Sequence, residues 1–255
     1  MKHFRQQKRP RKSSIISGKK DVIEAIVSGK ALERIYVDKK KTGEWLNSLK
    51  QVATSHHVPM NYVPVEKLNS FHVDHDGCLA VISPIHYYDL QQVISHVVEN
   101  GDVPLFLILD CITDIRNIGG IARTAFCTGV QALIIPDKGV GSLNEDAILT
   151  SAGALEQLPV CRVGSLMKAV DELHLNGIRV LASEMKAEKK VFDVDFTTPT
   201  AIVMGSEEKG IYPALMKSCD EKFSIPMAGE FESLNVSVAT GMILYEAMKQ
   251  RLFAR

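Results

Sequence analysis

The sequence lacks the features that mark disulfide-rich, zinc-binding, secreted and membrane proteins. Its five cysteines are odd in number, scattered and free of any C-x-x-C pair, which argues against a disulfide framework or a metal site and favours a reducing compartment. No apolar run approaches the roughly 18 residues of a membrane span. The basic N-terminus also has no apolar block of the kind that signal peptides carry. We therefore expect a cytoplasmic protein with no bound metal.

Charge is distributed unevenly, although the formal net charge is zero. Residues 1–20 hold eight of the 30 Lys and Arg residues and no acidic residue, so the rest of the chain carries 22 basic against 30 acidic residues, a net charge of −8. We place a basic, flexible arm at residues 1–14. Such an arm can neutralise the phosphates of a polyanion, although a solvated tail without a binding role would have the same composition.

The chain after the arm has the pattern of a small α/β domain, at residues 15–83. An apolar helical pattern ends at Gly29, and a strand core follows at residues 35–37. A second helix is expected at 43–55, and strands at “VPMNYVP” and at 78–83 complete the unit. Residues 84–102 are bounded by proline and mixed in character, with a helix starting near Asp89, and we interpret them as a linker.

From residue 103 onward, apolar runs alternate with helical patterns. The runs are “PLFLILD”, “ALIIP”, “LPVCRV”, “IRVLAS”, “TAIVMG” and “KFSIP”, and helices are expected near 117–129, 144–155, 165–176, 211–219 and 234–252. Continuous apolar strands that alternate with helices indicate a parallel sheet covered on both faces. Ligands of such sheets bind beyond the carboxyl ends of the strands. The loops after Asp110, Gly205 and Pro226 are therefore the places where a site is expected.

The first loop leads into a helix that carries two arginines. Arg116 and Asn117 stand at its start, and Arg123 lies about two turns further on. Gly119 and Gly120 would let the helix start pack closely on the sheet. Taken alone, a helix start capped by Asp or Asn, with two surface arginines, would account for this loop.

The second loop, “GSEEKG”, follows a strand that ends at Gly205. A glycine at a strand end permits the close approach of a ligand. The string is neither G-x-G-x-x-G nor a Walker loop, so a dinucleotide or a nucleoside triphosphate is poorly supported. Taken alone, the loop is more typical of a polar turn than of a site.

The third loop, “IPMAGEFESLNVSVATGM” at residues 225–242, has more polar groups than a helix start needs. The polar residues are Glu232, Ser233, Asn235 and Ser237. The apolar residues of the helical pattern are Leu234, Val238, Met242, Tyr245 and Met248. Capping requires only one of the polar residues, either Ser233 or Asn235. The surplus predicts a binding or catalytic site.

These three loops, in this order, resemble the motifs of a known family. The strings “RNIGGIARTAF”, “IVMGSEEKGI” and “IPMAGEFESLNVSVATGMILYEA” are similar to the three motifs of the SpoU (TrmH) RNA 2′-O-ribose methyltransferases of the SPOUT superfamily, across residues 104–252. Residues 15–83 resemble the small RNA-binding α/β domain of bacterial large-subunit rRNA guanosine methyltransferases in this family, on “SGKKDVIEAI” and the strand pattern. The resemblance implies a SPOUT domain at 103–255 with a C-terminal trefoil knot, a rare exception to the usual connection rules, and a homodimer whose catalytic domains share active-site residues.

The resemblance also implies a cofactor, S-adenosylmethionine, and assigns site residues by position. Backbone groups would hold the cofactor at Gly205, Ile225 and Leu234. Further cofactor contacts would come from Met204, Pro226, Met227 and Ser233. The catalytic polar positions would be Asn117, Arg123, Glu207, Asn235 and Ser237. The neighbouring Glu208 falls at a variable position, so Glu207 is the acid assigned to the site.

Each catalytic position has an expected role. A guanidinium stays protonated in proteins, so we expect Arg123 to clamp the phosphate beside the target ribose rather than to act as a base. Asn117 would help to fix Arg123, and Asn235 and Ser237 would orient the 2′-hydroxyl. The phosphate or water would accept the proton. The positive charge of the cofactor disappears in the reaction, so no metal is demanded.

The expected activity is methyl transfer from S-adenosylmethionine to a ribose 2′-hydroxyl of RNA. A guanosine of large-subunit rRNA is the expected target, because the tRNA enzymes of this family generally lack the amino-terminal domain. A tRNA ribose methyltransferase stays open as an alternative. So does a non-catalytic RNA-binding or ribosome-assembly factor, although such a factor would not need Asn117, Arg123 and Asn235 together.

Overall fold

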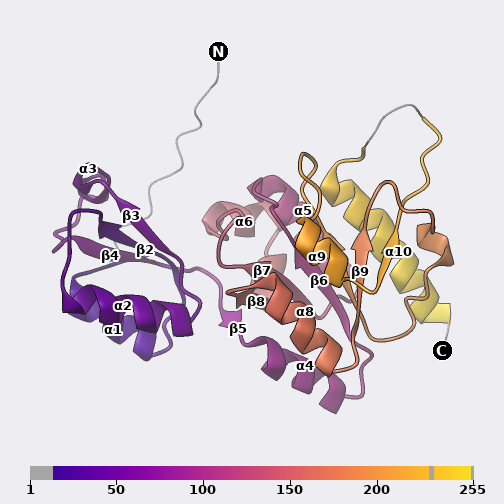
Figure 1. The fold of residues 1–255 in the computed structure, drawn as a ribbon, viewed down its shortest axis with the longest axis horizontal. Coiled ribbons are helices and arrows are strands. Elements are labelled where there is room, and N and C mark those ends of the chain that lie inside the picture. The colour runs from indigo at the N-terminus through magenta and orange to yellow at the C-terminus, as the bar shows by residue number, and fades with distance from the viewer. Residues whose placement is uncertain (1–13, 230–232, 254–255) are drawn as a thin grey trace. The chain divides into compact units, whose positions relative to one another are not determined.

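The computed structural model describes residues 14–229 and 233–253 and divides the chain into two units, Met1–Pro84 and Ile85–Arg255 (Figure 1). Residues 1–13 of the expected arm lie outside the described residues. Each unit has its own sheet and its own hydrophobic core.

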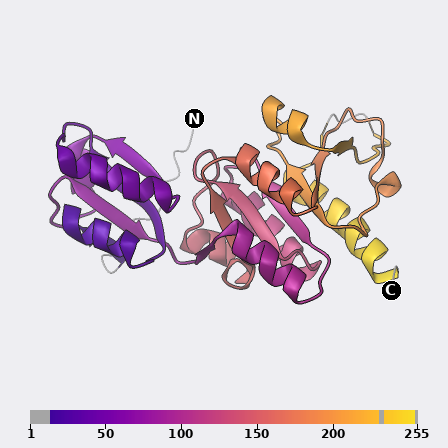
Figure 2. The same cartoon turned by 60° about the horizontal axis from the view of Figure 1, so that its bottom comes forward.

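Unit 1, Met1–Pro84, is a mixed four-stranded sheet with two helices on one face (Figure 2). Its elements are β1 (Ile15–Ser17), α1 (Lys19–Val27), β2 (Leu32–Asp38), α2 (Glu44–Ser55), β3 (Met60–Val63), α3 (Val65–Asn69) and β4 (Cys78–Ile82). The strand order is β1-β4-β2-β3, in which β4 runs antiparallel to β1 and β2, and β2 runs parallel to β3. The α/β character predicted for this part of the chain is confirmed.

The core of unit 1 follows from the alternation of side chains along its strands. Successive residues of a strand point to opposite faces. Ile35 and Ala80 therefore pack with the buried residues of α1 and α2, whereas Leu79 packs on the other face with Leu68 of α3. Both faces of the small sheet thus bury apolar side chains.

Unit 2, Ile85–Arg255, is built on a seven-stranded sheet in which every pair of neighbouring strands is parallel, as far as the described residues show. The strand order is β11-β9-β10-β6-β7-β8-β5. Its strands are β5 (Tyr87–Tyr88), β6 (Leu105–Leu109), β7 (Ala132–Pro136), β8 (Val160–Val163), β9 (Arg179–Ser183), β10 (Thr200–Met204) and β11 (Glu221–Phe223). Its helices are α4 (Leu90–Glu99), α5 (Ile115–Cys127), α6 (Glu145–Thr150), α7 (Ala154–Gln157), α8 (Leu166–Leu175), η2 (Val191–Asp193), α9 (Pro213–Ser218) and α10 (Val236–Phe253).

Helices cover both faces of this sheet, which confirms the predicted architecture (Figures 1 and 2). The central strand β6 shows why its sequence is apolar throughout. Leu105, Leu107 and Leu109 pack on the face of α5 and α10, and Phe106 and Ile108 pack on the face of α4, α8 and α9. A strand buried on both faces has no side for polar residues.

The structure corrects the expected linker at residues 84–102. Tyr87 and Tyr88 form β5, which pairs with β8 at the edge of the large sheet. Leu90 and Ile94 of α4 are buried in the same cluster as β6 and β7. The sequence of this segment mixes apolar and polar residues because only one face of α4 is buried, and an amphipathic surface helix shows that pattern.

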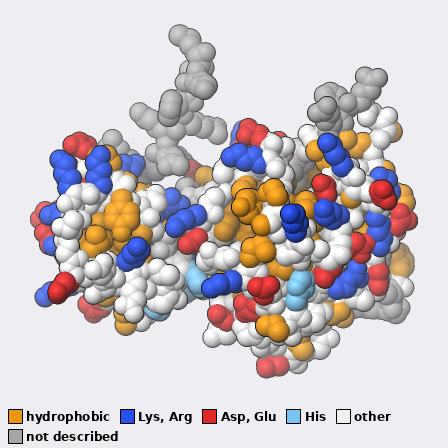
Figure 3. Space-filling model, viewed as in Figure 1, with side chains coloured by type: hydrophobic (Ala, Val, Ile, Leu, Met, Phe, Trp, Pro, Cys, Tyr) orange, Lys and Arg blue, Asp and Glu red, His pale blue; other side chains and the backbone are white. Residues whose placement is uncertain are grey.

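The described residues contain no helix with both the length and the apolar character that a membrane crossing requires. The face of the molecule in Figure 3 shows Lys and Arg side chains interspersed with Asp and Glu on both units. The described residues of that face therefore form no single large basic patch, in contrast to the excess of Lys and Arg in the first 20 residues of the sequence.

The five cysteines differ sharply in exposure, which predicts their order of reaction with a thiol reagent. Burial raises the pKa of Cys78 and of Cys161 to about 12, whereas Cys127 is exposed. The thiolate is the reactive form. We expect alkylation at pH 8 to modify Cys127 first and to reach Cys78 and Cys161 only after denaturation, as peptide mass spectrometry would show. Labelling of Cys78 in the native protein as fast as Cys127 would contradict this burial.

Candidate active site

The loops expected to form a site do meet at the carboxyl edge of the large sheet, where β6 and β10 end side by side. The strands β6 and β10 lie side by side, and the N–H of Asp110 donates to the carbonyl of Met204 at 2.9 Å where both strands end. The loop after β6 leads into α5, the loop after β10 leads to α9, and the segment after β11 leads to α10. Side chains from all three segments converge there.

The carboxylate of Glu207 joins these three segments. Its Oε1 accepts hydrogen bonds from Asn235 Nδ2 at 2.7 Å, from the backbone N–H of Val236 at 3.0 Å and from Asn117 Nδ2 at 3.4 Å. Asn235 Nδ2 also donates to Asn117 Oδ1 at 3.0 Å. Three of the five residues expected at catalytic positions therefore form one hydrogen-bonded cluster, which we call the Glu207 cluster (Asn117, Glu207 and Asn235), and a fourth, Ser237, bonds to it through Asn235.

Asn235 has two functions in this cluster, because it also caps α10. Its Oδ1 accepts from the backbone N–H groups of Ser237 at 3.0 Å and Val238 at 3.4 Å, and from the hydroxyl of Ser237. A side-chain oxygen that accepts from the first free N–H groups is the usual N-cap. Of the two candidate caps, Asn235 is thus the one used. Ser233 is exposed and forms no hydrogen bond with another described residue.

The start of α5 combines a cap with close helix packing. Asp114 Oδ1 accepts from the N–H of Arg116 at 2.9 Å, and the Arg116 guanidinium forms an ion pair with the same carboxylate at 2.7 Å. A Cβ on Gly120 would lie 3.4 Å from the Cβ of Ser237, so α5 approaches α10 closely there. A Cβ on Gly119 would overlap Thr150 of α6. These glycines therefore serve contacts between helices rather than the contact with the sheet that was expected.

Arg123 does not join the Glu207 cluster. Its side chain is exposed, and it forms no hydrogen bond or ion pair with another described residue. The amide of Asn117, which was expected to fix Arg123, is instead engaged by Glu207 and Asn235. Six residues of an α-helix turn through about 240° beyond a full turn, so Asn117 and Arg123 point in different directions from α5.

The loop that carries Glu207 is tightly folded. The N–H of Gly210 donates to the carbonyl of Ser206 at 2.8 Å, and Gly210 has a φ of +64°, in the region that favours glycine. A Cβ on Gly205 would lie 2.2 Å from the carbonyl carbon of Gly210. Gly205 is therefore required by the close return of the loop on itself.

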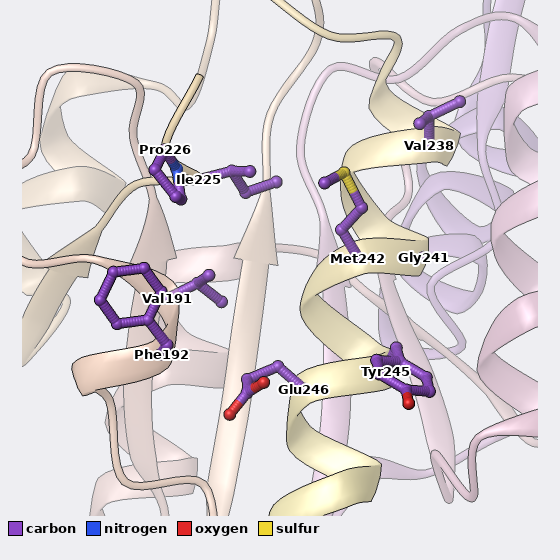
Figure 4. Close-up of a pocket in the computed structure, with 9 residues that line it drawn as sticks. All are labelled: Val191, Phe192, Ile225, Pro226, Val238, Gly241, Met242, Tyr245 and Glu246. Atoms are coloured by element: carbon purple, nitrogen blue, oxygen red, sulfur yellow. The ribbon is translucent and has the colours of Figure 1, made fainter. Parts of the chain in front are cut away.

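A pocket of about 480 Å³ lies beside this site, between α10 and the segments around η2 and Ile225 (Figure 4). Of the seven residues assigned to the cofactor, Ile225 and Pro226 border it. Val191 and Phe192 lie on the same side of the pocket as Ile225 and Pro226 (Figure 4). Met242 points across the pocket toward Ile225 (Figure 4). The other lining residues are Val238, Gly241, Tyr245 and Glu246.

The remaining cofactor positions have different environments. Met204 is only 3% exposed and packs in the core beneath the loops, and Leu234 is half-buried. Met227 is exposed, next to Pro226. Gly205, Met204 and Leu234 are not among the residues that line the pocket. The structure thus brings two of the seven expected cofactor residues, Ile225 and Pro226, to the lining of this pocket, and the other five are not part of that lining.

Two features of the site were not recognised in the sequence. Val238, Met242 and Tyr245 follow the helical pattern of α10, yet they are 52%, 47% and 60% exposed. Spacing alone could not reveal this, because it shows that residues share a face but not whether that face is covered. The other feature is the buried carboxylate of Asp110, for which the only signal was its place at the end of an apolar strand.

A parallel sheet with helices on both faces and polar loops at the carboxyl ends of its strands is typical of a ligand-binding α/β domain. Residues 104–245 match the SpoU rRNA methylase family, and residues 15–88 match a domain described as RNA 2′-O ribose methyltransferase substrate binding. The chain belongs to the SpoU rRNA methylase family.

Relatives match nearly the whole chain. YacO of Bacillus subtilis (strain 168), named as a TrmH family tRNA/rRNA methyltransferase, is 32% identical over 237 residues, which cover 92% of this chain and 95% of YacO. A TrmH family protein of Staphylococcus aureus (strain MW2), with the same description, is 34% identical over 239 residues, which cover 93% and 96% of the two chains.

Solved structures are similar to the fold of the whole chain or of part of it. The SpoU methyltransferase AviRb from Streptomyces viridochromogenes, also solved in complex with the cofactor AdoMet, is 27% identical and covers 94% of this chain and 90% of its own, with a TM-score of 0.60. The A. aeolicus TrmH/SpoU tRNA modifying enzyme is 30% identical and covers 65% of this chain and 85% of its own, with a TM-score of 0.55.

The geometry of the Glu207 cluster predicts different effects for two adjacent acids. Replacing Glu207 by alanine removes the acceptor of three donors, and each net hydrogen bond contributes about 1 kcal/mol or less at an exposed site. We expect E207A to lower the Tm by about 2 to 4 °C and to shift the NMR signals of the Asn117 and Asn235 side-chain amides. E208A, in the same loop, is the matched control and should change neither. Equal shifts from both variants would show that the cluster is not held by Glu207.

Proposed function

We propose that this protein transfers a methyl group from S-adenosylmethionine to the 2′-hydroxyl of a ribose in RNA, and that the target is a guanosine of large-subunit rRNA. As a member of the SpoU family, the chain is an RNA methyltransferase that uses S-adenosylmethionine. The observation that carries the finer proposal is the Glu207 cluster, which joins a polar residue from each of three loops beside a pocket. Its RNA target would place the enzyme in the cytoplasm.

The choice of rRNA over tRNA is supported by the extent of the matches. Two solved structures of proteins that act on tRNA, the A. aeolicus TrmH/SpoU tRNA modifying enzyme and a protein of the 2-OH methylation of C/U34 on tRNA, cover 65% and 60% of this chain, although they are matched over 85% and 99% of their own length. About a third of this chain or more has no counterpart in them. The match of residues 15–88 to a substrate-binding domain supports a role for that part in selecting a larger or more structured RNA. A tRNA target is the alternative that this proposal rejects.

The residues beside the cluster fit a cofactor of this kind. The pocket has a volume of about 480 Å³, within the range of small-molecule sites, and its lining is mainly apolar. Ile225 and Pro226 would contact the cofactor there, and Gly205 and Leu234 would contribute backbone groups at its margin. S-adenosylmethionine, when bound, supplies the methyl group and the positive charge that makes this group electrophilic.

The chain's own polar groups would orient the ribose. In the structure the Ser237 hydroxyl donates its proton to Asn235 Oδ1, so the Ser237 oxygen keeps lone pairs that can accept the ribose 2′-OH. Glu207 fixes Asn235 and Asn117 through their Nδ2 groups. Positioning of this kind can lower a barrier by about 7 to 11 kcal/mol in the best intramolecular cases. Glu207 thus serves as the support of the site.

Arg123 is proposed to act at the site of a second copy of the chain. It is exposed and forms no bond with another described residue, and it lies on α5 three residues before Phe126, which is 43% exposed. Together with the exposed apolar residues Leu252 and Phe253 at the end of α10, which lie outside the pocket lining, this supports a homodimer formed through unit 2. In the dimer, Arg123 would clamp the RNA phosphate beside the ribose of its partner's site, and that phosphate or water would accept the proton.

The trefoil knot implied by the family remains part of this proposal. Parallel strands far apart in sequence, such as β6 and β10, lie side by side, and the Glu207 loop and the segment before α10 meet at the site. Crystallographic tracing of the chain through residues 205–236 tests it. A path in which neither segment passes through a loop of the chain would remove the knot.

A non-catalytic RNA-binding factor is the second candidate function, because a family scaffold can lose its chemistry. Calorimetry with S-adenosylmethionine and with its demethylated product separates the two candidates. We expect both compounds to bind the wild-type protein, with the heat of binding lost in Met242→Trp, a variant that fills the pocket from a side chain that points across it. The absence of binding to either compound would favour the factor.

The target is predicted to be visible in the RNA of a deletion strain. We expect mapping of 2′-O-methyl groups across total RNA to show one guanosine of large-subunit rRNA that loses its methyl group when the gene is deleted and regains it with the wild-type gene. The Asn235→Ala variant is the control and should not restore the signal. Loss of a tRNA methyl group instead would refute the rRNA target, and no loss at all would refute the activity.

A mixing experiment tests the shared site. Arg123→Ala and Asn235→Ala should each abolish transfer, and Arg123→Ala should leave cofactor binding largely intact. If sites are shared, refolding the two variants together should restore about a quarter of the wild-type rate, because random pairing makes half of the dimers mixed and each mixed dimer has one intact site. Arg116→Ala, an exposed arginine already paired with Asp114, is the control and should stay active. No recovery on mixing would place Arg123 in its own copy's site or outside catalysis.

A further inference from the structure

The carboxylate of Asp110 is buried at the end of the central strand and has no role in the chemistry described so far. The residue is 6% exposed, and it forms no ion pair with another described residue. Taking a charged carboxylate out of water costs several kcal/mol unless hydrogen bonds compensate it. Its hydrogen bonds therefore indicate what the residue is placed to hold.

Those bonds tie Asp110 to the base of the loop that carries Glu207. Its Oδ2 accepts from the backbone N–H of Tyr212 at 2.6 Å, a short distance that is typical of a charged acceptor. Its Oδ1 accepts from the thiol of Cys111 at 3.3 Å. Its own N–H donates to the carbonyl of Met204, one residue before the loop begins. Asp110 thus contacts the chain on both sides of residues 205–211.

This arrangement fixes where the loop stands on the sheet. One end of the loop is held because Met204 is the last residue of β10, which is paired with β6. The other end is held by the Asp110 carboxylate at Tyr212. Between them the loop is closed by the bond from Gly210 to Ser206, so the position of Glu207 depends on both ends.

We propose that Asp110 is a positioning residue for methyl transfer: its carboxylate holds the loop at Tyr212 and so places Glu207 against Asn235 and Asn117. The inference rests on the proposed function for its catalytic consequence, but its structural part can be tested without activity. Asp110 itself touches none of the groups expected to contact substrate.

Amide hydrogen exchange tests the structural part. We expect Asp110→Ala to speed exchange at the Tyr212 amide about tenfold or more, because the amide loses its acceptor, and also to speed exchange at the Val236 amide, which donates to Glu207. Asp220→Ala is the matched control, since Asp220 accepts from the backbone N–H of Val180 at the amino end of β9. In this control, exchange should become faster at the Val180 amide and stay unchanged at the Tyr212 and Val236 amides. An unchanged Val236 amide in Asp110→Ala would overturn the proposal.

Kinetics test the catalytic part, with in vitro transcribed large-subunit rRNA as substrate. We expect Asp110→Ala to lower kcat about tenfold or more while KM for the RNA stays within about threefold. Asp110→Asn keeps an oxygen acceptor and should retain most of the activity. The double variant Asp110→Ala with Glu207→Ala should be no slower than Glu207→Ala alone, since coupled residues are not additive. A double variant whose loss in kcat equals the product of the two single losses would overturn the proposal. An inactive wild-type enzyme would refute the proposed function instead.

The same bond can be broken from the donor side if Asp110→Ala does not fold. Tyr212 has a φ of −54°, which proline adopts, so Tyr212→Pro removes the N–H without changing this angle. Tyr212→Ala removes the exposed ring and keeps the N–H. We expect only the proline variant to lower kcat and to speed exchange at Val236. Equal behaviour of the two variants would show that the bond to Asp110 does not position Glu207.

Discussion

The site depends on the carboxylate of Glu207, which binds three segments of the chain together. One oxygen atom accepts from Asn117, which is 90 residues away in the sequence, and from Asn235, which is 28 residues away. It also accepts from the N–H of Val236, so the first turn of α10 depends on it. Without this acceptor, three donors would need water as their partner, and the direct bond from Asn235 Nδ2 to Asn117 Oδ1 would be the remaining described bond between the two asparagines. The loop after β10 is therefore the support of the site.

Close packing of helices makes this convergence possible. Gly120 of α5 lies against Ser237 of α10, and Gly241 lies one turn further along the same contact, near Thr124. A Cβ at Gly120 would already contact Ser237 at 3.4 Å, so a side chain longer than that of alanine would press on the start of α10. Gly205 acts in the same way within the Glu207 loop, where a Cβ would overlap the backbone of Gly210. Steric limits at a few glycines thus set the distances over which the hydrogen bonds form.

Much of the fold could be predicted because it follows from local pattern. Uninterrupted apolar runs such as 105–109 identified strands buried on both faces, and family motifs identified the loops that would meet. The interpretation of residues 84–102 as a linker failed because α4 buries only one face, and β5 is too short for its alternation to be recognised. The cap of α10 could not be chosen between Ser233 and Asn235, because both have the required chemistry and only the path of the chain decides between them.

The sequence by itself determined the strands, the helices and the residue types that converge at their carboxyl ends, because periodicity and motif order are local properties of the chain. Only the tertiary structure decided the partners. In the folded chain, Asn117 forms hydrogen bonds with Glu207 and Asn235 rather than with Arg123, and the side chains of Arg123, Met242 and Tyr245 are exposed. The tertiary structure also buried Asp110 under the Glu207 loop. Partners and burial depend on contacts between residues far apart in sequence, and these distances are set by packing.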